Sequence, residues 1–325
     1  MHKQLSIEIK KIKTWPIIIG IGIINDIQNL FNFEPYSSII LMTDVITEKL
    51  YGKHMRNALA ATRKKVLTFI IPGGENSKTL PEATRGYRFL LDNAIDRKAL
   101  LCIMGGGVVG DLCGYIAATY LRGIDYIQVP TTFLAQVDSS IGGKVGVNFG
   151  DKKNMVGGFY QPRAIISDIT LLQSLPAEEW QNGMAEVIKY GLSMDKDLFH
   201  TLASRTASEF SPNELINIVE LCARLKTEIV IEDETEISGV RAILNFGHTI
   251  GHAIEALTNL HGPSHHGRAV VVGMMGAAKI SERMGIFNNN DILKIEAVFN
   301  AFDLSAHCHG IDPEDLIKAI RFDKK

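Results

Sequence analysis

Residues 99–120, ALLCIMGGGVVGDLCGYIAATY, combine an apolar strand, a glycine-rich turn and an apolar helix without interruption. We expect the strand over residues 99–104 and the helix from Leu112 to Tyr120. Glycines at such a turn let the backbone approach a pyrophosphate, and the N-terminus of the helix offers oriented N–H donors. The spacing departs from the GxGxxG fingerprint, so the turn taken by itself is also compatible with an ordinary tight turn.

Similar β-branched runs surround this stretch, at residues 17–21, 38–43, 66–71, 126–129 and 164–168. Continuous apolar strands separated by helix-length segments are typical of a parallel sheet that helices cover on both faces. After about Leu175 helical periodicity replaces the strands, over residues 177–192, 212–232, 247–258, 268–284, 291–302 and 313–322. The sequence therefore predicts an α/β fold, with a doubly wound, mainly parallel, Rossmann-like domain over residues 1–175 and an all-helical domain over residues 176–325.

The net charge, the apolar runs and the cysteines of the chain bear on which partners and which compartment it has. The chain has 325 residues, and its formal charge of −2 gives no electrostatic reason to bind nucleic acid or an anionic membrane. The first residues lack the apolar core of a signal peptide, and no run approaches the roughly 18 apolar residues of a membrane span. Cys102, Cys113 and Cys222 lie in apolar stretches, which is typical of buried thiols. We expect a cytoplasmic protein with neither a nucleic-acid nor a membrane partner.

Polar residues follow two other expected strands at the point where each ends. Asp44 follows the second strand, where an acidic side chain can bind a ribose hydroxyl, and Glu75 and Lys78 follow the third in a glycine-containing turn. Each of them is also an ordinary residue for a surface loop. Together with the glycine turn they describe the carboxyl edge of a parallel sheet, where dinucleotides bind.

The second half carries side chains that suit a metal. Glu186 and Lys189 lie three residues apart on one helical face, and His248 and His252 lie one turn apart on another. His266 comes just before the next expected helix. One carboxylate and two imidazoles would form a catalytic zinc site with an open position, although an ion pair and hydrogen-bonded core histidines are the ordinary alternatives. A second possible metal-binding cluster, His307-Cys308-His309, lies outside the expected helices.

Seven stretches resemble, in order, the signature blocks of the 3-dehydroquinate synthases, which are sugar-phosphate cyclases. They are GGGVVGDLCGYIAATYLRG, QVPTTFLAQVDSSIGGKVGVN, KNMVGGFYQP, GMAEVIKYG, LKTEIV, DETE and RAILNFGHTIGHAIE, and the resemblance covers roughly residues 15–325. It implies a homodimer that uses NAD and Zn²⁺ or Co²⁺ and acts on a phosphorylated sugar acid. The implied reaction converts 3-deoxy-arabino-heptulosonate 7-phosphate to 3-dehydroquinate and phosphate in the shikimate pathway, by transient oxidation by NAD, β-elimination, reduction and intramolecular aldol closure.

The resemblance also assigns residues to roles. It implies that the metal ligands are Glu186, His248 and His266. It implies that the cofactor contacts are Asp44, Glu75, Lys78, Gly105, Gly106, Gly107, Val108, Asp111, Thr131, Thr132, Asp138, Lys144 and Lys153. The implied residues around the substrate are Asp138, Lys144, Asn154, Lys189, Lys226, Arg241, Asn245, His252 and Lys324, and Arg122 would reach a neighbour's phosphate across a dimer interface.

Two features depart from the family pattern. Family members usually read HGEAV where this chain reads His266-Gly267-Arg268-Ala269-Val270, so a base replaces an acid near the expected metal. An inward Arg268 would disfavour a cation, whereas an outward one would be harmless. The chain also ends inside the block that contains Lys324, so we expect a truncated C-terminus. The alternatives are another NAD- and metal-dependent sugar-phosphate cyclase, a metal-dependent polyol dehydrogenase, and a catalytically impaired paralogue that acts by binding or oligomerisation.

Overall fold

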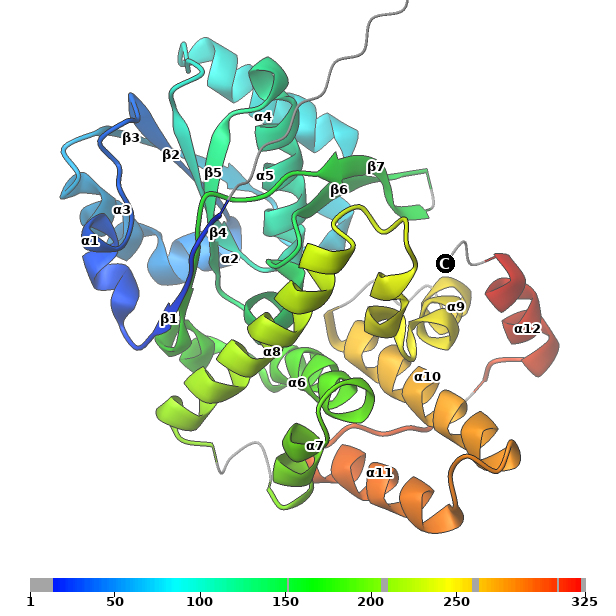
Figure 1. Cartoon of the computed structure of the whole chain (residues 1–325). Helices are drawn as coiled ribbons and strands as arrows, with labels where there is room; N and C mark the ends of the chain where they lie inside the picture. The colour runs from blue at the N-terminus through cyan, green and yellow to red at the C-terminus, as the bar shows by residue number, and fades with distance from the viewer. Residues whose placement is uncertain (1–13, 151, 206–209, 259–262, 309, 323–325) are drawn as a thin grey trace, which may run out of the picture.

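A parallel β-sheet with helices on both faces lies beside a helical part (Figure 1). The computed structural model describes residues 14–150, 152–205, 210–258, 263–308 and 310–322. Within them, six parallel strands form the sheet in the order β1-β8-β5-β4-β2-β3. The strands are β1 (Ile17–Gly20), β2 (Ser38–Asp44), β3 (Lys65–Ile71), β4 (Leu100–Gly105), β5 (Asp125–Pro130) and β8 (Ile165–Asp168). The predicted α/β fold with a parallel sheet is confirmed.

Successive side chains of the central strands enter two separate cores. Ile40 and Met42 of β2 pack with α4 (Leu80–Asp92) and α5 (Gly107–Thr119), whereas Ile39 and Leu41 pack with α1 (Ile27–Leu30) and α3 (Lys53–Ala60). Side chains of a strand alternate between the two faces of its sheet, so helices on both faces bury successive residues of the strand. All seven residues of β2 are buried for this reason.

The strand order changes direction between β2 and β4. β3 continues the sheet on one side of β2, while β4, β5, β8 and β1 extend it on the other. Ligands of doubly wound folds bind at the carboxyl ends of the strands at such a reversal. Because Thr43 of β2 pairs with Met104 of β4, Asp44 and Gly105 emerge side by side at this position.

An antiparallel hairpin, which the sequence analysis did not predict, lies outside the main sheet. It consists of β6 (Lys144–Phe149) and β7 (Lys152–Phe159). Val147 joins the core around α4 and α5, and a Cβ atom at Gly114 of α5 would lie 2.4 Å from a side-chain carbon of Val145. Glycine at position 114 therefore lets the hairpin pack directly on α5.

The second half of the chain is helical, as predicted. Its helices are α6 (Ala177–Ser193), α7 (Lys196–Ala203), α8 (Pro212–Glu232), α9 (His248–Thr258), α10 (Pro263–Arg283), α11 (Asn289–Ala301) and α12 (Pro313–Phe322). The short α7 was not predicted, and α10 begins at Pro263 rather than at residue 268, so His266 lies in its first turn. Phe133 and Val137, which follow β5, enter the core of the helical part, so the two parts share buried contacts. The boundary at residue 175 stays a prediction.

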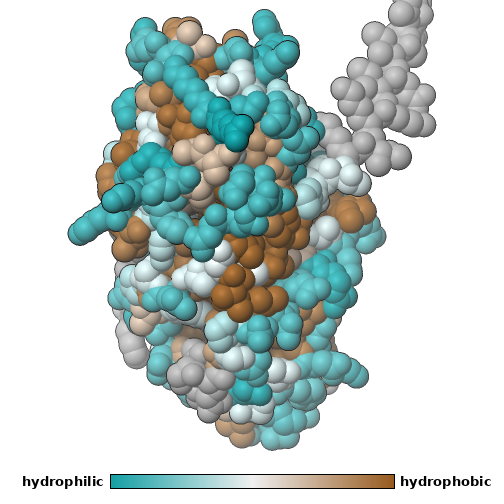
Figure 2. Space-filling view, turned by 90° about the vertical axis from the view of Figure 1, so that its left-hand side faces the viewer, coloured by the Kyte–Doolittle hydropathy of each residue, from teal (hydrophilic) through white to brown (hydrophobic). Residues whose placement is uncertain are grey.

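The surface of the sheet-bearing part mixes polar and apolar side chains. Figure 2, which shows the left-hand side of Figure 1, has hydrophilic residues over most of this face and apolar residues across its middle. Val45, Ile46 and Ile70 are among the exposed apolar side chains of this part of the chain. Among the helices that the structure describes, none combines the length and apolar composition that a membrane crossing needs.

Candidate active site

Three helices bring together the three predicted metal ligands: Glu186 on α6, His248 at the start of α9 and His266 on α10. Oε1 of Glu186 lies 3.5 Å from Nε2 of His248 and 3.6 Å from Nε2 of His266. Ligand atoms of one tetrahedral zinc ion, bonded at about 2.0–2.1 Å, lie about 3.3 Å apart. The donor set and its spacing therefore fit an ion of this kind.

Two glycines of α10 explain why the three ligands can meet. A Cβ atom at Gly267 would lie 2.8 Å from Cα of Asn182 on α6, and one at Gly273 would lie 1.9 Å from the carbonyl oxygen of Gly247. Any larger residue at these two positions would push α10 away from α6 and from the start of α9. α10 contacts both helices, and Figure 1 shows the three beside one another.

Both histidine ligands have a partner on the nitrogen that faces away from Glu186. Nδ1 of His248 lies 3.3 Å from the carbonyl oxygen of Phe246, and Nδ1 of His266 lies 3.5 Å from Oε2 of Glu255. Such partners fix the ring orientation of metal-binding histidines. The ring of His252 lies edge-on to that of His248, with 5.3 Å between their centroids. Glu255 had no role in the sequence analysis.

Two buried lysines face two carboxylates beside the triad. Lys189 forms an ion pair with Glu186, and Nζ of Lys226 lies 3.0 Å from Oδ1 of Asp138 and donates to the carbonyl oxygen of Asp138 at 2.6 Å. Burial alone would raise the pKa of both carboxyls, but the charges of these lysines and, at Glu186, of the two histidine ligands outweigh it. They lower the pKa of Asp138 to about 2 and hold that of Glu186 well below its usual value. The site thus combines metal-binding groups with fixed positive charge.

The two histidine ligands have opposite pKa shifts. Burial lowers the pKa of His248 to about 4, although the charge of Glu186 opposes this shift. For His266 burial would also lower the pKa, but hydrogen bonds and charge from Glu186 and Glu255 outweigh it and raise the pKa to about 9. A ligand imidazole must be neutral, so metal binding near pH 7 should release a proton from His266.

Tyr190 fixes the position of Asp138 in the site, and the sequence did not lead us to predict this role. Its buried hydroxyl donates to Oδ1 of Asp138 at 2.7 Å. Tyr190 follows Glu186 by four residues, so a helical-face argument could have found it. We expect Tyr190→Phe to lower the free energy of unfolding by about 1.5–3 kcal/mol, because the lost hydrogen bond has a charged acceptor. Urea unfolding at pH 7 measures this loss.

Tyr126→Phe is the matched control for that substitution. The buried Tyr126 hydroxyl donates to a neutral acceptor, the carbonyl oxygen of Tyr160, at 2.6 Å. Its loss should cost about 0.5–1.5 kcal/mol. Equal losses in the two variants would contradict a special role for the bond between Tyr190 and Asp138.

The predicted nucleotide residues cluster at the carboxyl edge of the sheet. Nζ of Lys78, which is 4% exposed, lies 3.0 Å from Asp111 and 3.4 Å from Glu75. Glu75 also accepts from Asn148 of β6 at 2.8 Å, which fixes the hairpin to this loop. Asp44 caps α2 (Val45–Thr47) by accepting from the backbone of Ile46 and Thr47. A cavity of about 470 Å³ opens beside this edge, and its lining includes Gly73, Ser77 and Thr79.

The glycine turn has the features of an anion cradle. Gly106 precedes α5 and gives it no side-chain cap, so the first N–H groups of the helix remain available as donors. A Cβ atom at Gly106 would lie 2.9 Å from a side-chain carbon of Thr132, and one at Gly107 would lie 3.1 Å from Oγ of Ser139. The backbone N–H of Thr131 donates to Gly105 at 3.0 Å. Glycines at 106 and 107 thus let the turn pack on Thr132 and Ser139, and the uncapped N–H groups of α5 are the feature that fits an anion.

The nucleotide edge adjoins the metal triad. Ser139, which faces Gly107, belongs to the π-helical turn Ala135–Ser139 that also carries Asp138. Burial raises the pKa of Asp111, and the charges of Lys78 and Lys226 oppose this shift. Lys226 therefore lies within electrostatic reach of both Asp111 and Asp138.

Of the other predicted residues, Lys144 and Asn154 lie on the hairpin, and Arg241 and Asn245 lie in the turn before α9. Nζ of Lys144 lies 2.6 Å from Glu236, and the buried Arg241 donates to the carbonyl oxygen of Glu234 at 2.8 Å. Asn154 has a positive φ of 56° on β7 and donates its N–H to Asn148. Asn245 ends the turn Val240–Asn245, three residues before His248. Lys324 lies outside the described residues.

Arg122 lies far from the site of its own chain. It is exposed and follows the C-terminus of α5, whereas the glycine turn precedes the N-terminus of that helix. α5 has 13 residues, which makes it about 20 Å long. Arg122 is therefore on the opposite end of α5 from the nucleotide edge.

Arg268 is exposed, so the departure from the family pattern is the harmless one. We expect Arg268→Glu, which restores the family residue, to change zinc affinity by less than about threefold, because an exposed charge is screened by solvent. Competition with a chelating dye measures this change. A tenfold gain in affinity would mean that the arginine repels the metal.

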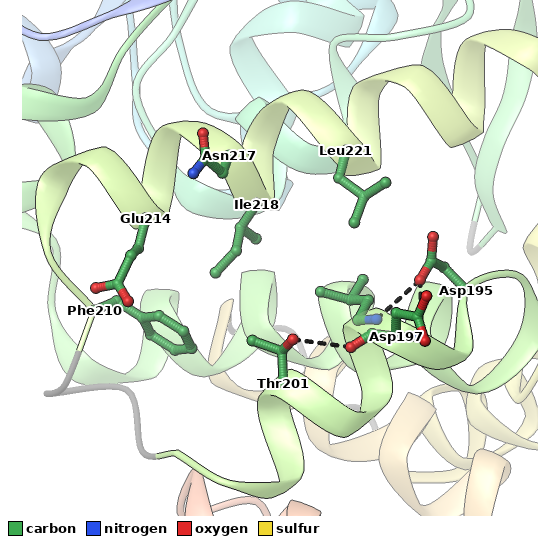
Figure 3. Close-up of a pocket in the computed structure, with 9 residues that line it drawn as sticks. Asp195, Asp197, Thr201, Phe210, Glu214, Asn217, Ile218 and Leu221 are labelled. Atoms are coloured by element: carbon green, nitrogen blue, oxygen red, sulfur yellow. Dashed lines mark hydrogen bonds between the residues drawn. The ribbon is translucent and has the colours of Figure 1, made fainter.

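A hollow of about 300 Å³ between α7 and α8 lies apart from this site (Figure 3). Two of the acidic side chains that line it already have partners, since Asp195 caps α7 and Glu214 forms a capping box with Ser211. In the second possible metal-binding cluster, His307 and Cys308 are exposed, and His309 lies outside the described residues. Neither place adds chemistry to the candidate site.

The fold and the site together define a class of protein: a doubly wound α/β protein with a glycine cradle beside a glutamate–histidine metal triad on helices. Comparison with known protein families identifies the family within this class. The N-terminal profile of 3-dehydroquinate synthase matches residues 68–182, and its C-terminal profile matches residues 183–325. The chain belongs to the 3-dehydroquinate synthase family.

Individual relatives agree with this placement. A 3-dehydroquinate synthase of Desulforamulus reducens is 42% identical over 317 residues, which are 96% of this chain and 88% of the relative. The solved structure of a 2-deoxy-scyllo-inosose synthase with carbaglucose-6-phosphate, NAD⁺ and Co²⁺ is 28% identical, has a TM-score of 0.85, and matches over 94% of this chain and 83% of its own. A 2-epi-5-epi-valiolone synthase of Streptomyces hygroscopicus, at 22% identity and a TM-score of 0.88, shares the fold over 98% of this chain and 88% of its own.

Proposed function

We propose that this chain is a 3-dehydroquinate synthase, which converts 3-deoxy-arabino-heptulosonate 7-phosphate to 3-dehydroquinate and phosphate in the shikimate pathway. The observation that carries this proposal is the triad of Glu186, His248 and His266, held beside buried lysines and next to a glycine cradle. A relative with this activity in its name, 42% identical over 96% of the chain, supports the assignment.

The chain's own residues fit both implied cofactors. Zn²⁺ or Co²⁺ would bind to the triad, and NAD would bind at the edge formed by the predicted cofactor residues, from Asp44 to Lys153. When bound, NAD supplies a reversible oxidation and the metal supplies Lewis acidity toward substrate hydroxyls. The 2-deoxy-scyllo-inosose synthase, whose structure holds NAD⁺ and Co²⁺, supports this pairing.

The protein's part in the reaction is to bind and orient an anionic substrate. Lys189, Lys226 and Arg241 are buried cations that would balance the carboxylate and phosphate of a sugar acid. Asp138 holds Lys226 in place and is itself held by Tyr190. The remaining implied substrate contacts are Lys144, Asn154, Asn245, His252 and Lys324. Because buried ion pairs keep their geometry, these charges are oriented before the substrate arrives.

We further propose a homodimer in which Arg122 serves the site of a second copy. Its position at the far end of α5, about 20 Å from the glycine cradle, supports this role because it cannot serve its own chain's site. A cytoplasmic location is proposed as well. It is supported by the free, buried thiols of Cys102, Cys113 and Cys222, which suit a reducing compartment.

An assay of phosphate release and dehydroquinate formation, with 3-deoxy-arabino-heptulosonate 7-phosphate, catalytic NAD and zinc, tests the function. Both products should form in equal amounts without lasting NADH. Turnover of glucose 6-phosphate instead would favour the 2-deoxy-scyllo-inosose type of cyclase, and accumulating NADH would favour a polyol dehydrogenase. No turnover of any of these substrates by a chain that binds zinc would favour an impaired paralogue.

A further inference from the structure

Glu255 contacts two different parts of the molecule with its two carboxylate oxygens. Oε1 accepts a hydrogen bond from Nζ of Lys153 on β7 at 3.0 Å, and Oε2 lies 3.5 Å from Nδ1 of His266 on α10. The side chain of Glu255 is 9% exposed, whereas that of Lys153 is 40% exposed. Glu255 itself belongs to α9, which also carries His248.

The position of Glu255 determines which nitrogen of His266 faces the triad. Nδ1 points to Glu255, and Nε2 points to Oε1 of Glu186 at 3.6 Å. A carboxylate behind a histidine ligand fixes its tautomer and ring orientation and makes it a stronger ligand. His248 has only a neutral backing group, the carbonyl of Phe246, at 3.3 Å. The carboxylate of Glu255 therefore acts on one of the two histidines and not on the other.

We infer that Glu255 is a positioning residue for the metal site: it holds His266 with Nε2 toward Glu186. The inference rests on the metal site proposed above. The competing explanation is that Glu255 is only the ion-pair partner that ties the hairpin to α9.

Geometry favours the first explanation. The side chain of Lys153 is 40% exposed, and an ion pair with such a lysine is weak because solvent screens it. The side chain of His266 is 28% exposed, which is less than that of Lys153. The better-protected contact of Glu255 is thus the one with the metal ligand.

Zinc affinity of the metal-stripped full chain, measured by competition with a chelating dye and without NAD or substrate, tests the inference. We expect Glu255→Leu to weaken zinc binding by about 10- to 100-fold, the usual effect of losing such a partner. Glu255→Gln keeps the size of the side chain and one acceptor oxygen, so its loss should be smaller, about two- to tenfold. Lys153→Met should weaken binding by less than about threefold, because the exposed ion pair is weak.

Two further variants make the result unambiguous. Glu228→Gln, at an exposed glutamate of α8, is the matched control and should bind zinc like the parent chain. His266→Ala should lose most of the affinity, and circular dichroism checks that each metal-free variant is folded. If Glu255→Leu does not fold, Glu255→Gln decides alone, and a loss below twofold then counts against the inference.

The outcomes separate the inference from the site on which it rests. A large loss in His266→Ala, with Glu255→Leu unchanged or no worse than Lys153→Met, overturns the positioning role alone. An unchanged affinity in His266→Ala overturns the proposed metal site and the inference with it.

Discussion

Glu186→Gln is expected to remove zinc binding and turnover together, with zinc affinity falling by more than the roughly 100-fold that loss of an outer partner causes. Glu186 is the one carboxylate of the triad and faces both histidines, and an amide oxygen is a much weaker ligand. The substitution also leaves Lys189, which is 2% exposed, without its carboxylate. We therefore expect about 3–5 kcal/mol of destabilisation as well. Metal analysis, phosphate release and urea unfolding measure the three effects.

Two controls separate metal loss from charge burial in this variant. Glu178→Gln changes an exposed glutamate in the first turn of the same helix and should alter neither zinc content nor stability. Adding Lys189→Met to Glu186→Gln should restore much of the stability without restoring zinc. Full zinc content in Glu186→Gln would show that the triad is not the metal site.

Asp138→Asn is expected to lower the free energy of unfolding by roughly 3 kcal/mol at pH 7, because it removes the counter-charge of the buried Lys226. Its pH dependence gives a second signature. The folded pKa of about 2 lies below the ordinary value near 4, so the carboxylate stabilises the fold fully above pH 4. That stabilisation is lost as the pH falls from 4 toward 2. The parent chain should therefore lose more stability than Asp138→Asn in this window.

Urea unfolding of the metal-free chain between pH 7 and pH 2 tests this expectation. Burial alone would raise the pKa of Glu255, but His266 and Lys153 lower it to about 2, so the variant should keep part of the acid sensitivity. Asp26→Asn, at an exposed aspartate, is the control and should leave the pH profile as it is. Identical acid sensitivity in Asp138→Asn and the parent would contradict the assigned pKa.

The sheet was predictable because its buried strands appear in the sequence as short continuous apolar runs. β2 is buried at every position and carries the apolar run 39–42, since both faces of the sheet are covered, and such a run can be recognised without knowledge of its neighbours. The hairpin was missed for the opposite reason. Seven of the eight residues of β7 are exposed, so its pairing with β6 leaves no apolar pattern in the sequence. α7 has only eight residues, which is too few for a clear helical periodicity in the sequence.

In the candidate site, too, some residues could be predicted from the sequence and others could not. The glycine cradle and the metal ligands could be predicted from residue type and spacing. The ligands are Glu186, His248 and His266. Glu255 follows His248 by seven residues on the same helical face, so that spacing could have indicated it. Its partners could not be read from the sequence, because Lys153 lies 102 residues away and meets it only through tertiary packing.

The same sequence separation bears on how the molecule folds. Glu186 lies 62 residues before His248 in the chain, and the contact between Lys153 and Glu255 spans the two parts of the fold. Contacts between distant segments form late, after the loop-closure entropy has been overcome. A partly folded chain would therefore lack the triad, and zinc would bind only the finished structure. At 100 times its dissociation constant, zinc would then stabilise that structure by about 2.7 kcal/mol, which makes the time course of zinc uptake a probe of the last step of folding.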